Sequence, residues 1–294
     1  MKEFWKKHIL IFCTVMVVIV VLSNLTLGLL QGNYATGFQS FYLIEAGFKT
    51  VIIVLLLILV ARWQLFCKRK GKKILWGCMI GALNLLFVLE NLLPLTLVKP
   101  DYIQVQGTII ASICLAKISV GVMEELGIRG VLLPLLCEKW TGKKHLCMKA
   151  AFASSLLFAG VHFSWTIREL LFRGGILGAD FLVNLSQVFF AFCFGMLAAG
   201  ITLYSGSMIP MMIWHSVVSI SAFLVHGLMS DVMYRYYMEK NLLTMQNVFE
   251  TYGILSNVEN GYAIYSCMMN ILVLAVGIIL VYRVEKSVAG KEMK

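Results

Sequence analysis

The chain has 294 residues, of which 60% are hydrophobic and only 14% charged, and its mean hydropathy is +0.86. Soluble domains carry about a quarter charged residues, and one soluble core of this size could not hide so much apolar surface. These values exclude a soluble globular protein and indicate a single integral membrane domain over residues 1–294.

Eight hydrophobic segments are long enough to cross a bilayer, since a helical span needs about 20 residues. In chain order they lie near 8–30, 42–62, 74–97, 107–136, 149–163, 179–203, 208–228 and 262–282. The fifth is short, and the fourth is longer than a span needs, so it is tilted or continues into the interface. The sequence therefore predicts an all-α, polytopic membrane helix bundle of about eight transmembrane helices.

The net charge of +10 is distributed as a topology signal. Lys and Arg cluster in the alternate polar segments 2–7, 62–73, 139–149 and 283–294. Because positive residues favour the cytoplasmic side, this alternation predicts that both termini are cytoplasmic. The same charges attract anionic lipid headgroups, so membrane lipids are expected partners and nucleic acid is not. The basic loops favour a multi-pass protein of a bacterial plasma membrane.

The eight cysteines are scattered along the chain without CxxC spacing. This pattern indicates neither a disulfide framework nor a zinc ribbon. We expect the cysteines to serve as small apolar packing residues.

Charged residues inside the expected spans are costly and must be buried in the bundle or hydrated. Glu45 and Lys49 lie four residues apart on one helix face, in the favoured acid-first order, so we expect them to neutralise each other. Lys117 either extends to the interface or pairs with a carboxylate. For these three residues we expect a structural role.

The segment GVMEELGIRG, residues 121–130, places two carboxylates and an arginine within the fourth span. At about 100° per residue, Glu125 and Arg129 project from nearly the same side and can form an intrahelical ion pair. Glu124 points elsewhere and requires partners from other helices. A carboxylate in such surroundings is a candidate general base or acid.

Two later segments supply candidate partners for Glu124. FAGVH places Phe158 and His162 four residues apart at the end of a helix rich in small residues, which permit close helix packing. SMIPMMIWHSVVS, residues 207–219, places His215 and Ser219 four residues apart on one helix face. Each histidine alone has an ordinary packing explanation; together with Glu124 they indicate a catalytic site.

The ordered set EExxxR, FxxxH and a later His preceded by Ser-x-x-Pro resembles the CPBP family of intramembrane glutamic proteases. This family includes the CAAX prenyl endopeptidases and bacterial bacteriocin-processing and immunity proteins. The segment 184–210 is similar to the family's third motif, an aromatic residue followed by glycine. The resemblance covers residues 107–219, which we expect to be the catalytic core.

The resemblance implies an intramembrane endopeptidase that needs no cofactor and acts on a peptide or lipid-modified protein. Glu124 with His162 would activate water, His215 and Ser219 would stabilise the oxyanion, and Glu125, Arg129 and Phe158 would support the site. The family usually has asparagine where this chain has Ser219, and a hydroxyl has a shorter reach than an amide. Loss of one oxyanion donor costs ~2.7–4 kcal/mol of transition-state stabilisation, so this substitution bears on activity.

Three other functions are compatible with the residues. Glu and His ligands on separate helices suit a zinc-dependent membrane protease, although no HExxH motif is present. Ser219 favours a non-catalytic immunity or scaffold protein of the same family. A transporter with a charged midplane site would be expected to show an internal repeat, which the sequence lacks.

Overall fold

The computed structural model describes residues 8, 11, 38–62, 71–92, 105–172, 179–224, 228 and 257–292. Within these ranges the ordered segments are helices, and no strand occurs. The prediction of an all-α polytopic bundle is therefore confirmed. The first expected span, 8–30, lies outside the described residues except for positions 8 and 11, so the count of eight stays a prediction.

The helices coincide in position with the other seven expected spans, although α8 and α14 extend beyond the expected bounds and α10 ends earlier. Their bounds are α3 Phe38–Arg62, α4 Gly71–Gly81, η1 Ala82–Asn84, α5 Leu85–Leu92, α6 Gly107–Glu125, η4 Leu126–Leu132, α7 Leu133–Lys139, α8 Leu146–Phe172, α9 Ala179–Ser205, α10 Ile209–Phe223 and α14 Asn257–Glu292. The helix α8 is longer than the expected fifth span, 149–163, but the part of it that is apolar enough to cross a membrane is Leu146–Phe163, close to the expected bounds.

Five described helices are long and apolar enough to cross a membrane, and α10 is a shorter apolar helix. The five spans are Ser40–Ile58, Gly71–Leu89, Leu146–Phe163, Leu185–Ser205 and Cys267–Val288. Large apolar side chains such as Leu43, Phe48 and Val51 of α3 are exposed on the outside of the bundle. Such a surface is stable against lipid but not against water, which supports an integral membrane protein.

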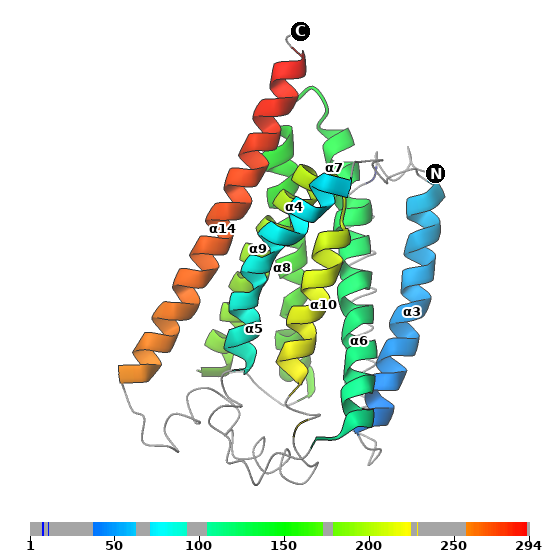
Figure 1. Cartoon of the computed structure of the whole chain (residues 1–294), viewed down its shortest axis with the longest axis vertical. Helices are drawn as coiled ribbons and strands as arrows, with labels where there is room; N and C mark the ends of the chain where they lie inside the picture. Colours follow the sequence, from blue (N-terminus) through cyan, green and yellow to red (C-terminus); the bar gives the residue numbers. More distant parts are fainter. Residues whose placement is uncertain are drawn as a thin grey trace.

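Figure 1 shows α3 and α14 on opposite flanks of the bundle. The helix α3 packs on α6, which also packs on α10, whereas α14 packs on α9, which in turn packs on α8. The elements α6, α8, α9 and α10, which carry the sequence motifs, are thereby joined through direct contacts. Together they form the centre of the bundle.

The expected fourth span is one continuous helical segment with a change of helix type in the middle. It begins as α6, widens into the π-helical segment η4 and ends as α7. Pro134 contributes to this change, since it has no N–H for the carbonyl of Gly130 and its ring crowds that carbonyl. Short π segments are frequent at functional sites, and η4 begins directly after Glu124 and Glu125.

Small residues bring these helices into close contact. A Cβ added to Gly195 of α9 would lie 3.0 Å from the Cβ of Ser155 on α8, and one added to Gly121 of α6 would lie 2.8 Å from the backbone nitrogen of Ser216 on α10. The expected close approach of the small-residue helix that precedes His162 is confirmed. Membrane helices associate through such van der Waals packing, since lipid provides little hydrophobic driving force between them.

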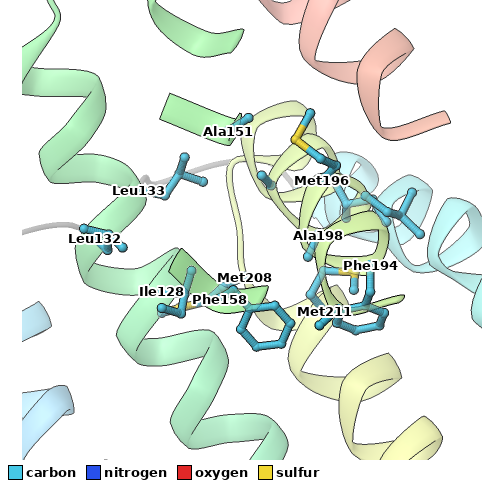
Figure 2. Packing of buried hydrophobic residues seen from close by; sticks show 14 of the residues in the cluster. Ile128, Leu132, Leu133, Ala151, Phe158, Phe194, Met196, Ala198, Met208 and Met211 are labelled. Carbon is cyan, nitrogen blue, oxygen red and sulfur yellow. The ribbon is translucent and has the colours of Figure 1, made fainter. Parts of the chain in front are cut away.

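The core is a cluster of buried apolar side chains, most of them from η4, α7, α8, α9 and α10, with further members from α3, α5, α6 and α14. Figure 2 shows its centre, where Ile128 of η4, Phe158 of α8 and Met211 of α10 are among the labelled side chains. The turn that follows α9 includes Gly206, whose φ of 69° is a left-handed conformation that glycine adopts easily. This tight turn places α10 back against the core.

Candidate functional site

A cavity of about 640 Å³ lies between α3, α5, α6, α8, α9, α10 and α14. Five of the candidate site residues line it: Glu124, Phe158, His162, His215 and Ser219. They come from three helices that meet only in the folded bundle. Glu125 and Arg129 lie fully buried beside it, with exposed fractions of 0% and 1%.

His215 lies between the two neighbouring carboxylates. Its Nδ1 lies 3.0 Å from Oε1 of Glu125, and its Nε2 lies 3.5 Å from Oε2 of Glu124. Because a carboxylate only accepts, Nδ1 carries a proton and donates it to Glu125. The Nε2–Oε2 contact is attractive only when a second proton resides on His215 or on Glu124. This pair is therefore arranged to share a proton.

Glu125 and Arg129 form the expected intrahelical ion pair, but each has a further role. Nη1 of Arg129 donates to Oε1 of Glu125 at 3.1 Å, and Nη2 donates to the carbonyl of Gly195 at 3.2 Å. The two residues also have partners outside the pair, since Glu125 accepts from His215 and Arg129 donates to α9. The pair anchors the site to its supporting helices.

Aromatic rings fix the positions of the histidines. The Phe158 ring contacts both His162 and His215 edge-on, with centroid distances of 5.0 and 5.8 Å, and lies 4.5 Å from the guanidinium carbon of Arg129. Phe194 contacts His215 at 4.9 Å. Such rings restrict the histidines and keep the surroundings apolar, which strengthens electrostatic interactions.

His162 presents one ring nitrogen to its own helix. Its Nδ1 lies 3.0 Å from the carbonyl oxygen of Phe158, which can only accept a hydrogen bond. Nδ1 therefore carries the proton, and Nε2 of the neutral ring is an acceptor. This tautomer suits a group that accepts a hydrogen bond from water. Glu124 has His215 as its close partner, and His162 lines the same cavity.

Ser219 lies one turn after His215 on α10 and lines the cavity, as its spacing predicts. Nearby, Nδ2 of Asn91 donates to the hydroxyl of Ser221 at 3.0 Å and so links α5 to α10. The hydroxyl of Ser219 is a short donor on the same surface as His215.

Three charged residues that we expected to be structural also line this cavity. Glu45 and Lys49 form the expected pair at 2.7 Å, and Lys117 joins them with Nζ 2.9 Å from Oε2 of Glu45. The ion pairing was predictable, since four-residue spacing indicated Glu45–Lys49. The position of these residues at the cavity could not be predicted, because the contact between Lys117 and Glu45 joins residues 72 apart in the sequence.

Among the described residues, no group of three or more His, Cys, Asp or Glu side chains is arranged to hold a metal ion. Among those residues the cysteines are free thiols, and none forms a disulfide.

Comparison with protein families gives one match, in the motif-bearing part of the chain. The family model described as "Type II CAAX prenyl endopeptidase Rce1-like" matches residues 106–221. No curated protein and no solved structure matches the chain. The matched segment includes every candidate site residue named above from α6, α8, α9 and α10. The resemblance indicated by the sequence motifs is therefore confirmed: residues 106–221 are similar to the type II CAAX prenyl endopeptidases, a family of membrane proteases.

Proposed function

We propose that the protein is an intramembrane endopeptidase that hydrolyses peptide bonds of membrane-associated substrates, such as lipid-modified proteins, by a glutamate mechanism. The observation that carries this proposal is the position of His215, whose two ring nitrogens face the carboxylates of Glu124 and Glu125 at the wall of a cavity. A carboxylate and an imidazole that share a proton can transfer it during a reaction. The family match to residues 106–221 supports the same activity.

The proposed reaction begins with a water molecule between Glu124 and the acceptor nitrogen of His162. Glu124 takes a proton from the water, and the oxygen forms a bond to the carbonyl carbon of the substrate. Ser219 and the Nε2–H of His215, in the state in which the shared second proton resides on His215, donate hydrogen bonds to the resulting oxyanion. The proton on Glu124 then passes to the leaving nitrogen, and the C–N bond breaks, which gives an amine and a carboxylic acid.

The supporting residues keep this arrangement fixed. Glu125 holds the Nδ1 proton of His215, which leaves Nε2 on the side of Glu124. Arg129 neutralises Glu125 and binds Gly195, so the carboxylate cannot rotate freely. Preorganised donors are effective because they need no reorganisation in the transition state.

The direct test is cleavage of a prenylated reporter peptide by the full-length protein in liposomes. Glu124→Gln and Glu124→Ala should each lower the turnover ~10²–10⁴-fold, the usual contribution of a general base. Glu138→Gln, which removes a carboxylate on α7 outside the cavity, is the matched control and should cleave at the wild-type rate. Wild-type turnover in both Glu124 variants would contradict the glutamate mechanism.

A chelator distinguishes this mechanism from zinc catalysis. Under the proposed mechanism, protein treated with a strong chelator keeps its activity, because water is activated by Glu124 and not by a metal. Loss of activity on chelation, with recovery on addition of Zn²⁺, would establish the zinc alternative instead.

Ser219 is the feature that favours the second candidate, a non-catalytic immunity or scaffold protein. Complementation of a deletion strain separates the two functions. If the Glu124→Gln and Glu124→Ala variants restore the phenotype as well as the wild type does, the biological role does not require proteolysis.

A further inference from the structure

Asn270 of α14 is a polar residue of the cavity wall that the reaction proposed above does not use. Within residues 267–281 it is the only residue with an amide, hydroxyl or charged side chain. Asn270 is 6% exposed, whereas the adjacent Ile271 and Leu272 are 59% and 45% exposed, so its side chain lies on the bundle side of the helix. Polar side chains in a membrane span are costly and are typical of functional sites.

The packing of α14 on α9 determines the position of Asn270. Val273 and Gly277 lie one and two turns after Asn270 on the same face of α14. Val273 is fully buried, and a Cβ added to Gly277 would lie 2.7 Å from the backbone nitrogen of Leu197 on α9. This close contact fixes the height and rotation of α14, and thereby holds Asn270 at the cavity wall.

The amide of Asn270 has an unused hydrogen-bonding atom. Its Oδ1 is buried, and no described residue is a hydrogen-bond partner for it. A buried carbonyl without a donor is costly, and a lipid tail cannot supply one. The Cβ–Cγ torsion of asparagine is soft, so the oxygen can turn toward a molecule in the cavity. We therefore expect the missing donor to belong to a molecule that binds there.

The surroundings of Asn270 indicate the chemical class of that donor. The part of the wall that α9 and α14 contribute includes Ser186, Gln187, Phe189, Phe190, Cys267 and Asn270. Among the described residues of these two helices that line the cavity, none is charged. An ammonium or phosphate group would be buried here without a counter-charge, which is costly. A backbone N–H is a neutral and strong donor, and apolar surroundings strengthen its hydrogen bond.

Asn270 faces the same cavity as Glu124 and His215 but comes from another side of the bundle. Figure 1 shows α14 on the flank opposite to α3. The helix α14 packs on α8 and α9, and α8 carries His162. The family match ends at residue 221, so α14 lies outside it. Asn270 therefore adds a group of this chain's own to the cavity of the matched segment.

We propose that Asn270 is a substrate-binding residue, whose Oδ1 accepts a hydrogen bond from one backbone N–H of a peptide in the cavity. This inference rests on the proposed function for the presence of a peptide there. A backbone N–H is common to nearly all residues, so this contact does not select a sequence. It selects a conformation, because N–H groups in the interior of a helix are already bonded. The segment bound at Asn270 is therefore extended.

An ester scan locates the contact. Each prenylated reporter peptide has one backbone amide near the cleaved bond replaced by an ester, which removes one N–H, and cleavage of the unchanged bond is followed by mass spectrometry. In phosphatidylcholine nanodiscs, one ester position should lower kcat/KM ~5- to 30-fold more in the wild type than in Asn270→Leu, as expected for a hydrogen bond to a buried group. The other positions should affect both proteins equally. The absence of such a position would overturn the contact and leave the endopeptidase function intact.

Stability measurements and a control variant separate binding from a structural role. Asn270→Leu is similar in volume and removes an unpaired amide, so its Tm should be unchanged or higher. A structural role predicts a lower Tm and an equal loss of activity with every peptide. Asn84→Leu is the matched control, since Asn84 of η1 also has a buried, unpaired Oδ1 but is not among the residues that line the cavity. This control should give the wild-type ester profile, and the same loss in it would overturn the assignment.

Binding of uncleavable analogues separates the contact from the chemistry. The amide and ester peptides, with a ketomethylene group in place of the cleaved amide, are labelled and titrated into the same nanodiscs. A weaker Kd of one ester analogue that is seen in the wild type but not in Asn270→Leu supports the contact, even if no peptide is cleaved and the proposed function fails. Equal Kd values overturn it. Phosphatidylcholine has no N–H donor, whereas phosphatidylethanolamine has one. If Asn270→Leu weakens binding of phosphatidylethanolamine but of no peptide, the residue binds a lipid headgroup and the inference is overturned.

Discussion

At the scale of single residues, the buried ion pair of Glu125 and Arg129 is important for stability. Substitution of one of the two residues leaves the charge of the other buried without a partner. Arg129 is 1% exposed and is bonded to both Glu125 and Gly195. Removing one member of a buried pair leaves an uncompensated charge, whereas replacing both is much less costly. The same EE motif therefore contains one carboxylate that is held in a buried ion pair, Glu125, and one that lines the cavity, Glu124.

Arg129→Met should lower the free energy of unfolding by ~3–5 kcal/mol, because Glu125 is left buried without its cation. Glu125→Gln/Arg129→Met should recover much of this loss, since glutamine still accepts from His215 and carries no charge. Thermal unfolding in nanodiscs measures both variants. A double variant less stable than Arg129→Met would contradict the charge explanation.

Ser219 permits a second residue-scale prediction. Ser219→Ala should lower kcat by ~10²-fold with little change in KM, because an oxyanion donor acts in the transition state. Ser219→Asn should match or exceed the wild type, since the amide reaches further. The measurement is the cleavage rate of the reporter peptide. Full activity of Ser219→Ala would mean that the oxyanion is stabilised by other groups.

At the scale of elements, the close contact of α8 with α9 determines the position of the carbonyl that binds Arg129. A Cβ added to Gly195 would lie 3.0 Å from the Cβ of Ser155. The carbonyl of Gly195 accepts a hydrogen bond from Nη2 of Arg129. The aromatic-glycine motif therefore has two functions, since Phe194 contacts His215 and Gly195 allows close packing. A shift of α9 would disturb the arginine and the histidine together.

Gly195→Ala should lower both Tm and turnover, because α9 must move away from Ser155. Gly160→Ala on α8 is the matched control, since nothing lies within 4 Å of an added Cβ there. That control should keep its activity and gain up to ~1 kcal/mol from the higher helix propensity of alanine. Adding Ser155→Gly to Gly195→Ala should restore part of the turnover, since it removes the Cβ and Oγ contacts and leaves the Cα of residue 155 3.1 Å from the added Cβ. An unchanged Gly195→Ala variant would show that this contact does not determine the site.

At the scale of the whole molecule, a cavity inside an apolar bundle is lined by charged groups. Glu45 and Lys49 face it from α3 and Lys117 and Glu124 from α6, and α8 and α10 contribute the histidines. The outer surface of α3 is apolar, as lipid requires.

The alternation of basic segments predicts that both termini are cytoplasmic. A C-terminal green fluorescent protein fusion should be fluorescent, and a C-terminal alkaline phosphatase fusion should be inactive, when expressed in bacteria. A fusion after residue 100, in an expected external loop, should give the opposite result. Active phosphatase at the C-terminus would contradict the predicted cytoplasmic position of that terminus.

The sequence by itself determined the membrane class, the position of seven helices and the ion pairs within one helix. Both Glu45–Lys49 and Glu125–Arg129 have four-residue spacing, so helical periodicity alone brings their side chains together. The family motifs likewise indicated residues 107–219, and the family model matches 106–221.

Only the tertiary structure decided which distant groups meet. His215 and Glu125 are 90 residues apart, Lys117 and Glu45 are 72 apart, and Arg129 and Gly195 are 66 apart. The periodicity of a helix determines which residues share its face, but not which helix lies opposite. That choice follows from the joint packing of small residues on several helices, together with the π segment η4, and neither has a periodic signature in the sequence.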